Sequence, residues 1–271
     1  MSFKSTSRNA LLVLASCGLI LGACAAYEAG GAPAPAAPEP PPPPELTEEQ
    51  KIVARHVEAI GGADAIRAHT SMTIKGGFEM PAMGMSGDAT QYAMAPDKTL
   101  AKISLPGFGE IVNGVNGDIA WAEDPMQGPR VLGGAELADA KRQARFHAQL
   151  EYDETYPEQT AVGETEWNDQ TAHQLDLVDA DGNESSHYFA ADTGLLIGIE
   201  STQTNEMGTI EVAITMGDYK EFGGILMPTS TVLSMPSMGV EFTQTTESVT
   251  FDDVDPSVFE PSEAIKALLP E

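Results

Sequence analysis

Residues 109–123 read GEIVNGVNGDIAWAE, two apolar runs separated by Asn116, Gly117 and Asp118. Asn-Gly between apolar runs is a strong signal for a β-hairpin, because both residues accept the positive φ angles that a tight turn requires. The runs 109–115 and 119–123 are therefore predicted to be antiparallel neighbours in a sheet.

The same alternation of short apolar runs and turn residues continues on both sides of this hairpin. Strands joined by short turns have to be antiparallel, since parallel neighbours need a long crossover connection. The sequence thus predicts one mainly β domain of the α+β class, built as a meander. The further predicted strands are 72–80, 87–94, 99–105, 160–167, 172–178, 186–190, 195–202, 209–218, 226–234 and 240–251.

A helix is predicted to open this domain. Residues 47–50, TEEQ, have the form of a capping box, and an apolar stripe that includes Ile52 and Val57 follows them. Gly61 and the glycine after it end the helix. His56 lies beside the apolar stripe and is predicted to be a packing residue.

Two further helices complete the prediction. One, 135–150, interrupts the meander, and a short one, 262–269, closes the chain. The folded domain is predicted to span residues 47–271, a length within the range of single sandwiches and barrels.

The start of the chain is predicted to be an export signal. Its apolar run, 10–20, is too short to span a bilayer and follows a positively charged start. Residues 21–24, LGAC, resemble the bacterial lipobox, in which the cysteine is acylated and becomes the new N-terminus. We therefore predict a signal peptide over 1–23 and lipidation of Cys24 with fatty acids such as palmitate. Cys17 is the alternative lipidated residue, and an ordinary secretory signal is the alternative to both.

A proline-rich tether is predicted to join the lipidated cysteine to the domain. Residues 32–45 read APAPAAPEPPPPPE, and such runs favour an extended polyproline II chain that cannot form a core. The tether, 24–46, would hold the domain off a membrane surface. By resemblance to enterobacterial sorting rules, Ala25 after the cysteine favours the periplasmic face of the outer membrane.

The charge of the chain limits its partners. Its 14 Lys and Arg residues against 41 Asp and Glu residues give a formal net charge of −27. Such a surface repels phosphate backbones and anionic lipid headgroups, so nucleic acid is excluded as a partner. Attachment to a membrane is therefore predicted to come from the lipid anchor and not from charge.

Motifs for catalysis, cofactors and metals are missing. Both cysteines lie in the leader, so the domain has no disulfide and no thiolate site. The five histidines form no zinc motif, and no nucleophile elbow, P-loop or dinucleotide fingerprint occurs. Asp179, Asp181 and Asn183 alternate like part of a calcium loop but lack its later glutamate, so a turn is predicted. We expect no enzymatic activity, no cofactor and no metal.

A near-repeat, Met-Pro-x-Met-Gly, occurs at residues 80–84 and again at 235–239. The methionines could plug an end of the sheet, form an apolar rim around a ligand cavity, or bind a soft metal through their thioethers. Metal binding is disfavoured because no His or Cys lies beside either motif. The residues predicted to contact an apolar ligand are Met80, Met83, Met85, Trp121, Met126, Met235 and Met238.

Several segments, in order, resemble the LolA-like outer-membrane lipoprotein-sorting proteins. The likeness begins at residues 56–66, HVEAIGGADAI, and continues through 80–84, 117–121, 192–196 and 218–220. The resemblance implies a strongly curved antiparallel sheet, a half-barrel, with helices covering its concave side. It also implies a cavity that binds the acyl chains of lipoproteins or of lipids. A membrane-anchored chain is more similar to the LolB-type acceptor than to the soluble carrier.

Two functions follow as hypotheses. In the favoured one, the protein is an anchored envelope lipoprotein that binds a lipid or acyl chain in an apolar cavity, for lipoprotein sorting or lipid handling. In the alternative, it is a structural or interaction module without a cavity, and its partner is an envelope protease or an assembly machine. The state of the concave face distinguishes the two.

Overall fold

The computed structural model describes residues 45–205 and 208–269, and residues 45–271 form one compact unit. The predicted signal peptide, Cys17, Cys24 and the tether up to residue 44 lie outside the described residues. Within the described residues, no helix combines the length and the apolar character needed to cross a membrane.

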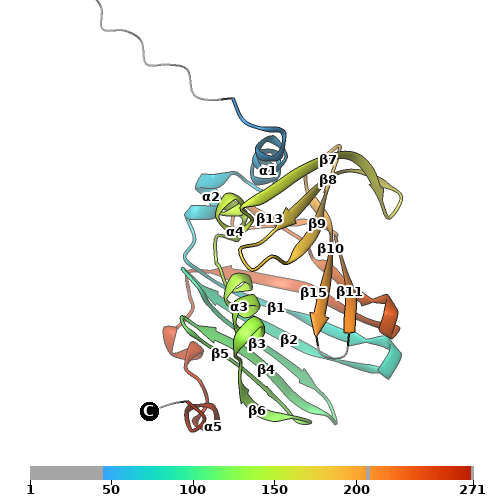
Figure 1. Ribbon diagram of the computed structural model, residues 1–271. Helices are drawn as coiled ribbons and strands as arrows, with labels where there is room; N and C mark the ends of the chain where they lie inside the picture. Colours follow the sequence, from blue (N-terminus) through green and yellow to red (C-terminus); the bar gives the residue numbers. More distant parts are fainter. Residues whose placement is uncertain (1–44, 206–207, 270–271) are drawn as a thin grey trace, which may run out of the picture. The chain divides into compact units, whose positions relative to one another are not determined.

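One large antiparallel sheet dominates the domain (Figure 1). Among the described residues it has 13 strands, and it is open, with β6 and β7 as its two edges. In spatial order the strands are β6 (Gly128–Val131), β5 (Ile119–Asp124), β4 (Gly109–Asn116), β3 (Lys98–Leu105), β2 (Met85–Met94), β1 (Ser71–Met80), β15 (Val240–Phe251), β14 (Ser230–Met235), β11 (Gly208–Gly217), β10 (Leu196–Asn205), β9 (Glu184–Ala190), β8 (Gln170–Val178) and β7 (Glu158–Trp167). A separate small hairpin pairs β12 (Lys220–Phe222) with β13 (Ile225–Met227).

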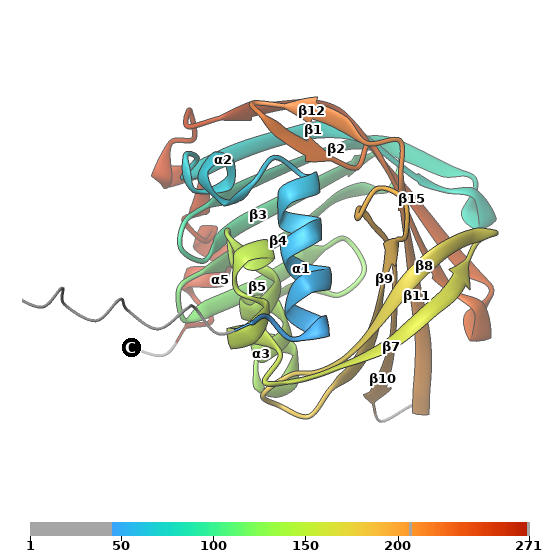
Figure 2. The ribbon, with the colours of Figure 1, turned by 90° about the horizontal axis from the view of Figure 1, so that it is seen from above.

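The helices lie within the curve of the sheet. They are α1 (Glu48–Ala59) and α2 (Ala63–Arg67) before the first strand, and α3 (Gly134–Gln143), a 3-10 turn (Ala148–Leu150) and α4 (Tyr152–Thr155) between the two edge strands. Figure 2 shows α1 inside the curve, with β1–β5 on one side of it and β7–β11 on the other. The predicted half-barrel with helices on its concave side is confirmed.

The first helix forms where the sequence predicts it. The side chain of Thr47 accepts from the backbone N–H of Gln50 at 3.3 Å, and the Gln50 side chain accepts from the backbone N–H of Thr47 at 3.2 Å. These two bonds satisfy N–H groups that have no partner inside a helix. Ile52 and Val53 then pack on a cluster that contains Leu175 in β8.

The opposite faces of β4 and β5 are covered by different segments. Ala120 packs with residues of α3, whereas Trp121, the next residue along β5, packs with Phe259 and Ile265. Successive side chains of a strand point to opposite faces, so the two covers lie on opposite sides of the sheet. The outer cover consists of a 3-10 turn (Pro256–Phe259) and α5 (Glu263–Lys266), of which only α5 lies within the predicted closing helix.

The predicted helix 135–150 ends early, at Gln143. The backbone N–H of Phe146 donates to the carbonyl of Pro96 at 2.9 Å, and the His147 ring donates to the carbonyl of His69 at 3.0 Å. The acceptors of these two hydrogen bonds lie far from the helix in the chain. The early end of the helix therefore could not be predicted from the residues of the helix alone.

The predicted strand 226–234 is also divided, because Pro228 has no N–H to donate and separates β13 from β14. Four short elements, β6, β12, α2 and α4, were not predicted. In β6, Pro129 interrupts the strand pattern and is tolerated because this strand is an edge of the sheet.

Candidate functional site

An apolar cavity of about 430 Å³ lies between the sheet and the helices on the concave side. This volume falls within the range of about 300–1,000 Å³ that is typical of small-molecule sites. Its walls come from α1, α2, α4, the 143–149 connection, the central strands and the small hairpin β12–β13. Apolar lining residues include Ile60, Ile66, Leu196, Ile199, Met216 and Phe251.

The glycine pair that ends α1 fixes one wall of this cavity. A Cβ added to Gly61 would lie 2.3 Å from the carbonyl oxygen of Gly224, and Gly61 has a φ of +126°. Only glycine fits such an approach without strain. The backbone N–H of Leu226 also donates to the carbonyl of Ile60 at 2.9 Å. The end of α1 is thereby held against the β12–β13 hairpin, whose residues line the cavity.

Two histidines lie buried in the cavity wall. His56 in α1 is 4% exposed, and His187 in β9 is 5% exposed. The Nδ1 atom of His56 lies 3.1 Å from the carbonyl oxygen of Gly194, and that of His187 lies 3.0 Å from the hydroxyl oxygen of Tyr152. Burial lowers the pKa of His56 to about 4 and that of His187 to about 3, so both rings are neutral near pH 7.

The arginine that borders the cavity is already paired with acids. The Arg142 guanidinium contacts the buried carboxylate of Asp179 and the carboxylate of Asp139. Desolvation opposes ionisation of Asp179, but hydrogen bonds from Asn183 and the nearby arginine hold the pKa of this carboxyl below its usual value. The charge of Arg142 is therefore balanced within the protein.

The backbone N–H groups of Asp181 and Asn183 also donate to Asp179, which confirms the predicted turn.

A third histidine at the cavity, His69, has hydrogen-bond partners within the protein for both of its ring nitrogens. Its Nδ1 lies 2.8 Å from Asp252 Oδ2, and its Nε2 lies 2.9 Å from the carbonyl oxygen of Gly223. Its ring also stacks on Phe251 with a centroid distance of 4.0 Å. The hydrogen bond to Asp252 is the main cause of the raised pKa of His69.

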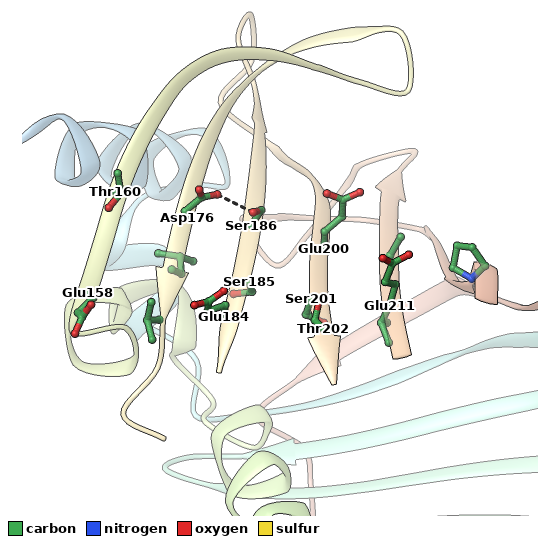
Figure 3. A pocket seen from close by; sticks show the side chains of 15 residues that line it. Glu158, Thr160, Asp176, Glu184, Ser185, Ser186, Glu200, Ser201, Thr202 and Glu211 are labelled. Atoms are coloured by element: carbon green, nitrogen blue, oxygen red, sulfur yellow. Dashed lines mark hydrogen bonds between the residues drawn. The ribbon is translucent and has the colours of Figure 1, made fainter. Parts of the chain in front are cut away.

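A second hollow, of about 590 Å³, lies along β7–β11 and has a different character. Figure 3 shows carboxylates from all five strands around it: Glu158, Asp176, Glu184, Glu200 and Glu211. Asp176 alternates with Leu175 and Leu177, so its side chain points to the face of β8 opposite α1. Within this hollow Ser186 donates to Asp176 at 2.7 Å, and Tyr188 donates to Glu200 at 2.6 Å. Its lining is more polar than apolar, so it offers an acyl chain less apolar surface than the cavity on the concave side does.

No group of three or more His, Cys, Asp or Glu side chains in the described part of the chain is arranged to hold a metal ion.

The two Met-Pro-x-Met-Gly segments fold into the same turn. Each forms a single 3-10 turn that ends in a left-handed glycine, Gly84 with φ 61° and Gly239 with φ 64°. Because β1 pairs antiparallel with β15, both turns lie at the same end of the sheet. Met83 and Met238 are exposed there, at 68% and 55%.

The five methionines of the two turns lie at one end of the sheet, but the seven residues predicted to contact a ligand do not all meet there. Met80 and Met85 face each other across the β1–β2 hairpin, and Met235 pairs with Val240. Met126 is 81% exposed in the β5–β6 turn, whereas Trp121 is 1% exposed in the outer core. None of the seven lines the apolar cavity, and their contact with a ligand stays a prediction.

The sequence analysis missed the polar groups of the cavity. His56 was expected to pack, and it is buried as expected, but His187 and Tyr152 were not considered. The sequence of β9 did contain a signal for His187. His187 and Phe189 are two positions apart in a strand and so share one face, and a histidine that shares a strand face with a buried aromatic residue is expected to be buried too.

No protein-family profile matches the sequence, and no curated protein matches it by sequence. Solved structures do match the fold. A DUF1329-family protein from Desulfovibrio piger is 11% identical with a TM-score of 0.58, over 81% of this chain and 100% of that protein. A LolA-superfamily protein from Nitrosomonas europaea is 12% identical with a TM-score of 0.55, over 80% of this chain and 99% of that protein. The domain therefore has a LolA-like fold.

Proposed function

We propose that this protein binds the acyl chain of a lipid in the apolar cavity on the concave side of its sheet. The observation that carries the proposal is the cavity itself, about 430 Å³ of mainly apolar space between the helices and the sheet. Burying an acyl chain there removes apolar surface from water, which is favourable by about 25 cal/mol per Å². The LolA-like fold supports the same conclusion, because the resemblance implies acyl-chain binding.

The proposed setting is the bacterial cell envelope. Cys24 would carry the lipid anchor and the proline-rich segment would hold the domain away from the membrane, at the periplasmic face of the outer membrane. Several acyl chains provide a stable anchor where a single chain does not. The protein would then receive or hold lipids, or lipoproteins, close to the membrane that it is attached to.

The alternative, an interaction module for an envelope protease or assembly machine, predicts a concave face filled by side chains. The cavity favours ligand binding over this alternative, because a filled core would leave no such space.

The test uses the chain from Ala25 onward, purified from a bacterial host without denaturation. Native mass spectrometry should show a co-purifying lipid, and the delipidated protein should bind the uncharged fluorescent probe N-phenyl-1-naphthylamine. Ile199→Trp, which adds a large side chain at the cavity wall, should abolish both signals. Val162→Trp adds at least as much volume at a position that is 54% exposed and should change neither. A lipid-free mass together with no probe binding by the parent protein would overturn the proposal.

A further inference from the structure

The two cavity histidines each have a ring nitrogen that the protein does not use. His56 and His187 bind through Nδ1, and no further hydrogen bond joins either ring to the described residues. Both rings are at least 95% buried and both line the cavity. The Nε2 atom of each ring is therefore left without a hydrogen-bond partner among the described residues, on a residue that lines the cavity.

The hydrogen bonds assign opposite roles to these two atoms. The carbonyl of Gly194 can only accept, so His56 carries its proton on Nδ1 and its neutral ring presents Nε2 as an acceptor. The hydroxyl of Tyr152 is buried and makes no other hydrogen bond among the described residues. Because a buried hydroxyl proton needs an acceptor, this hydroxyl donates to Nδ1 of His187. Nε2 of that ring then carries the ring proton and is an N–H donor.

The donor ring and the acceptor ring both lie beside Phe189. The ring centroids of His56 and His187 lie 5.3 Å and 6.4 Å from that of Phe189. A ligand group that accepts one hydrogen bond and donates another matches this pair, and a hydroxyl beside an ester carbonyl does both.

An anionic headgroup does not match the same site. Both histidine rings are neutral near pH 7, Arg142 is paired with Asp139 and Asp179, and His69 is paired with Asp252. A carboxylate or phosphate entering the cavity would lose its hydration without gaining an unpaired positive charge.

We propose that His56 and His187 bind the uncharged glycerol-ester headgroup of a lipid whose acyl chain fills the cavity. This inference rests on the proposed function, since the chain brings the headgroup to the two rings. It adds a selectivity: neutral glycerol esters bind, and free fatty acids and phospholipids bind more weakly.

The test compares two ligands with the same chain, 1-monodecanoylglycerol and decanoate, below their micellar concentrations at pH 7.5. Each is titrated against the chain from Ala25 onward loaded with N-phenyl-1-naphthylamine. The glycerol ester should displace the probe at a concentration at least about tenfold lower than decanoate, because decanoate has to bury an unpaired charge. Full-length neutral lipids and phospholipids, identified by mass spectrometry in the purified protein, should show the same order.

Variants assign the selectivity to the rings. His187→Phe removes the Nε2 donor and should reduce the preference for the glycerol ester several-fold while decanoate binding changes little. His173→Phe alters a β8 histidine that does not line the cavity and should keep the full preference. If His187→Phe does not fold, the preference of the parent protein for 1-monodecanoylglycerol over decanoate tests the headgroup proposal by itself.

Equal displacement by the two ligands would overturn the headgroup proposal and leave acyl-chain binding intact. Displacement by neither ligand would overturn both proposals.

Discussion

Trp121 occupies the space that a side chain on Gly114 would need. The two residues face each other across β4 and β5, and a Cβ added to Gly114 would lie 2.2 Å from Trp121 Cζ2. A second tryptophan covers Gly198 in β10, where an added Cβ would lie 2.2 Å from Cε2 of Trp167, although Trp167 belongs to β7, which is not paired with β10. Each tryptophan thus covers a glycine of the sheet.

We expect Gly114→Ala to lower the free energy of unfolding by about 1–3 kcal/mol, because the added methyl forces Trp121 out of its packed position. Urea denaturation followed by tryptophan fluorescence measures the loss. Gly217→Ala is the matched control, because no atom lies within 4 Å of the added Cβ, and its change should stay within about 0.5 kcal/mol. Equal losses in the two variants would contradict the packing argument.

The His69–Asp252 pair should stabilise the fold most between the ordinary pKa values of its members, 3.8 and 6.5. The hydrogen bond to Asp252 raises the pKa of His69, so its contribution is complete below pH 6.5 and is lost as the pH rises through the raised value. The hydrogen bond from His69 lowers the pKa of Asp252 to about 2, so its contribution is complete above pH 3.8 and is lost as the pH falls through about 2.

His69→Gln measures this effect. Because the pair is partly exposed, the loss in unfolding free energy at pH 5 should be about 1 kcal/mol or less, and it should shrink above pH 7. Asp253→Asn, at the adjacent carboxylate, should show no such pH profile. If the loss in unfolding free energy instead grew as the pH rose, the predicted direction of the pH dependence would be wrong.

The two cavity histidines should have the opposite effect on stability. Burial lowers the pKa values of His56 and His187 to about 4 and about 3, whereas the unfolded chain takes up these protons near pH 6.5. The folded state therefore loses stability as the pH falls below 6.5, by an amount on the order of a few kcal/mol at pH 4. In His56→Gln the fall between pH 6.5 and pH 4 should be shallower than in the parent protein. Parallel stability curves for the two proteins would refute this assignment.

The exposed methionines of the paired turns should not be needed for cavity binding. Met83→Ser combined with Met238→Ser is expected to leave N-phenyl-1-naphthylamine affinity unchanged, because neither side chain lines the cavity. Ile199→Trp serves as the positive control for loss of binding. A clear drop in affinity in the double serine variant would instead place ligand contacts at the turns, as the sequence predicts.

The lipid anchor is tested by its cysteine. Cys24→Ser should abolish incorporation of labelled palmitate and release the protein from the membrane fraction, since each buried methylene contributes about 0.8 kcal/mol to anchoring. Cys17→Ser should keep both properties. Labelling that survives in the first variant and disappears in the second would move the anchor to Cys17.

Local signals predicted most of the strands because each depends on residues close together in the chain. The turn that follows Asn116, formed by Gly117 and Asp118, and the capping box at Thr47 appear where expected, since the positive φ of Gly117 and the capping hydrogen bonds are satisfied within a few residues. The helix predicted over 135–150 ended early because its competing hydrogen bonds come from Pro96 and His69, which no local pattern reveals.

The sequence by itself determined an antiparallel meander, its turns and its opening helix, because alternation, turn chemistry and capping act over a few residues. Only the tertiary structure decided which side of each strand faces the cavity and which residues meet there. His56 and His187 are 131 positions apart in the numbering, and they come together only because the curved sheet carries β9 against α1. The polar groups of the cavity are thus set by the curvature of the whole sheet, which depends on long-range packing and not on a motif.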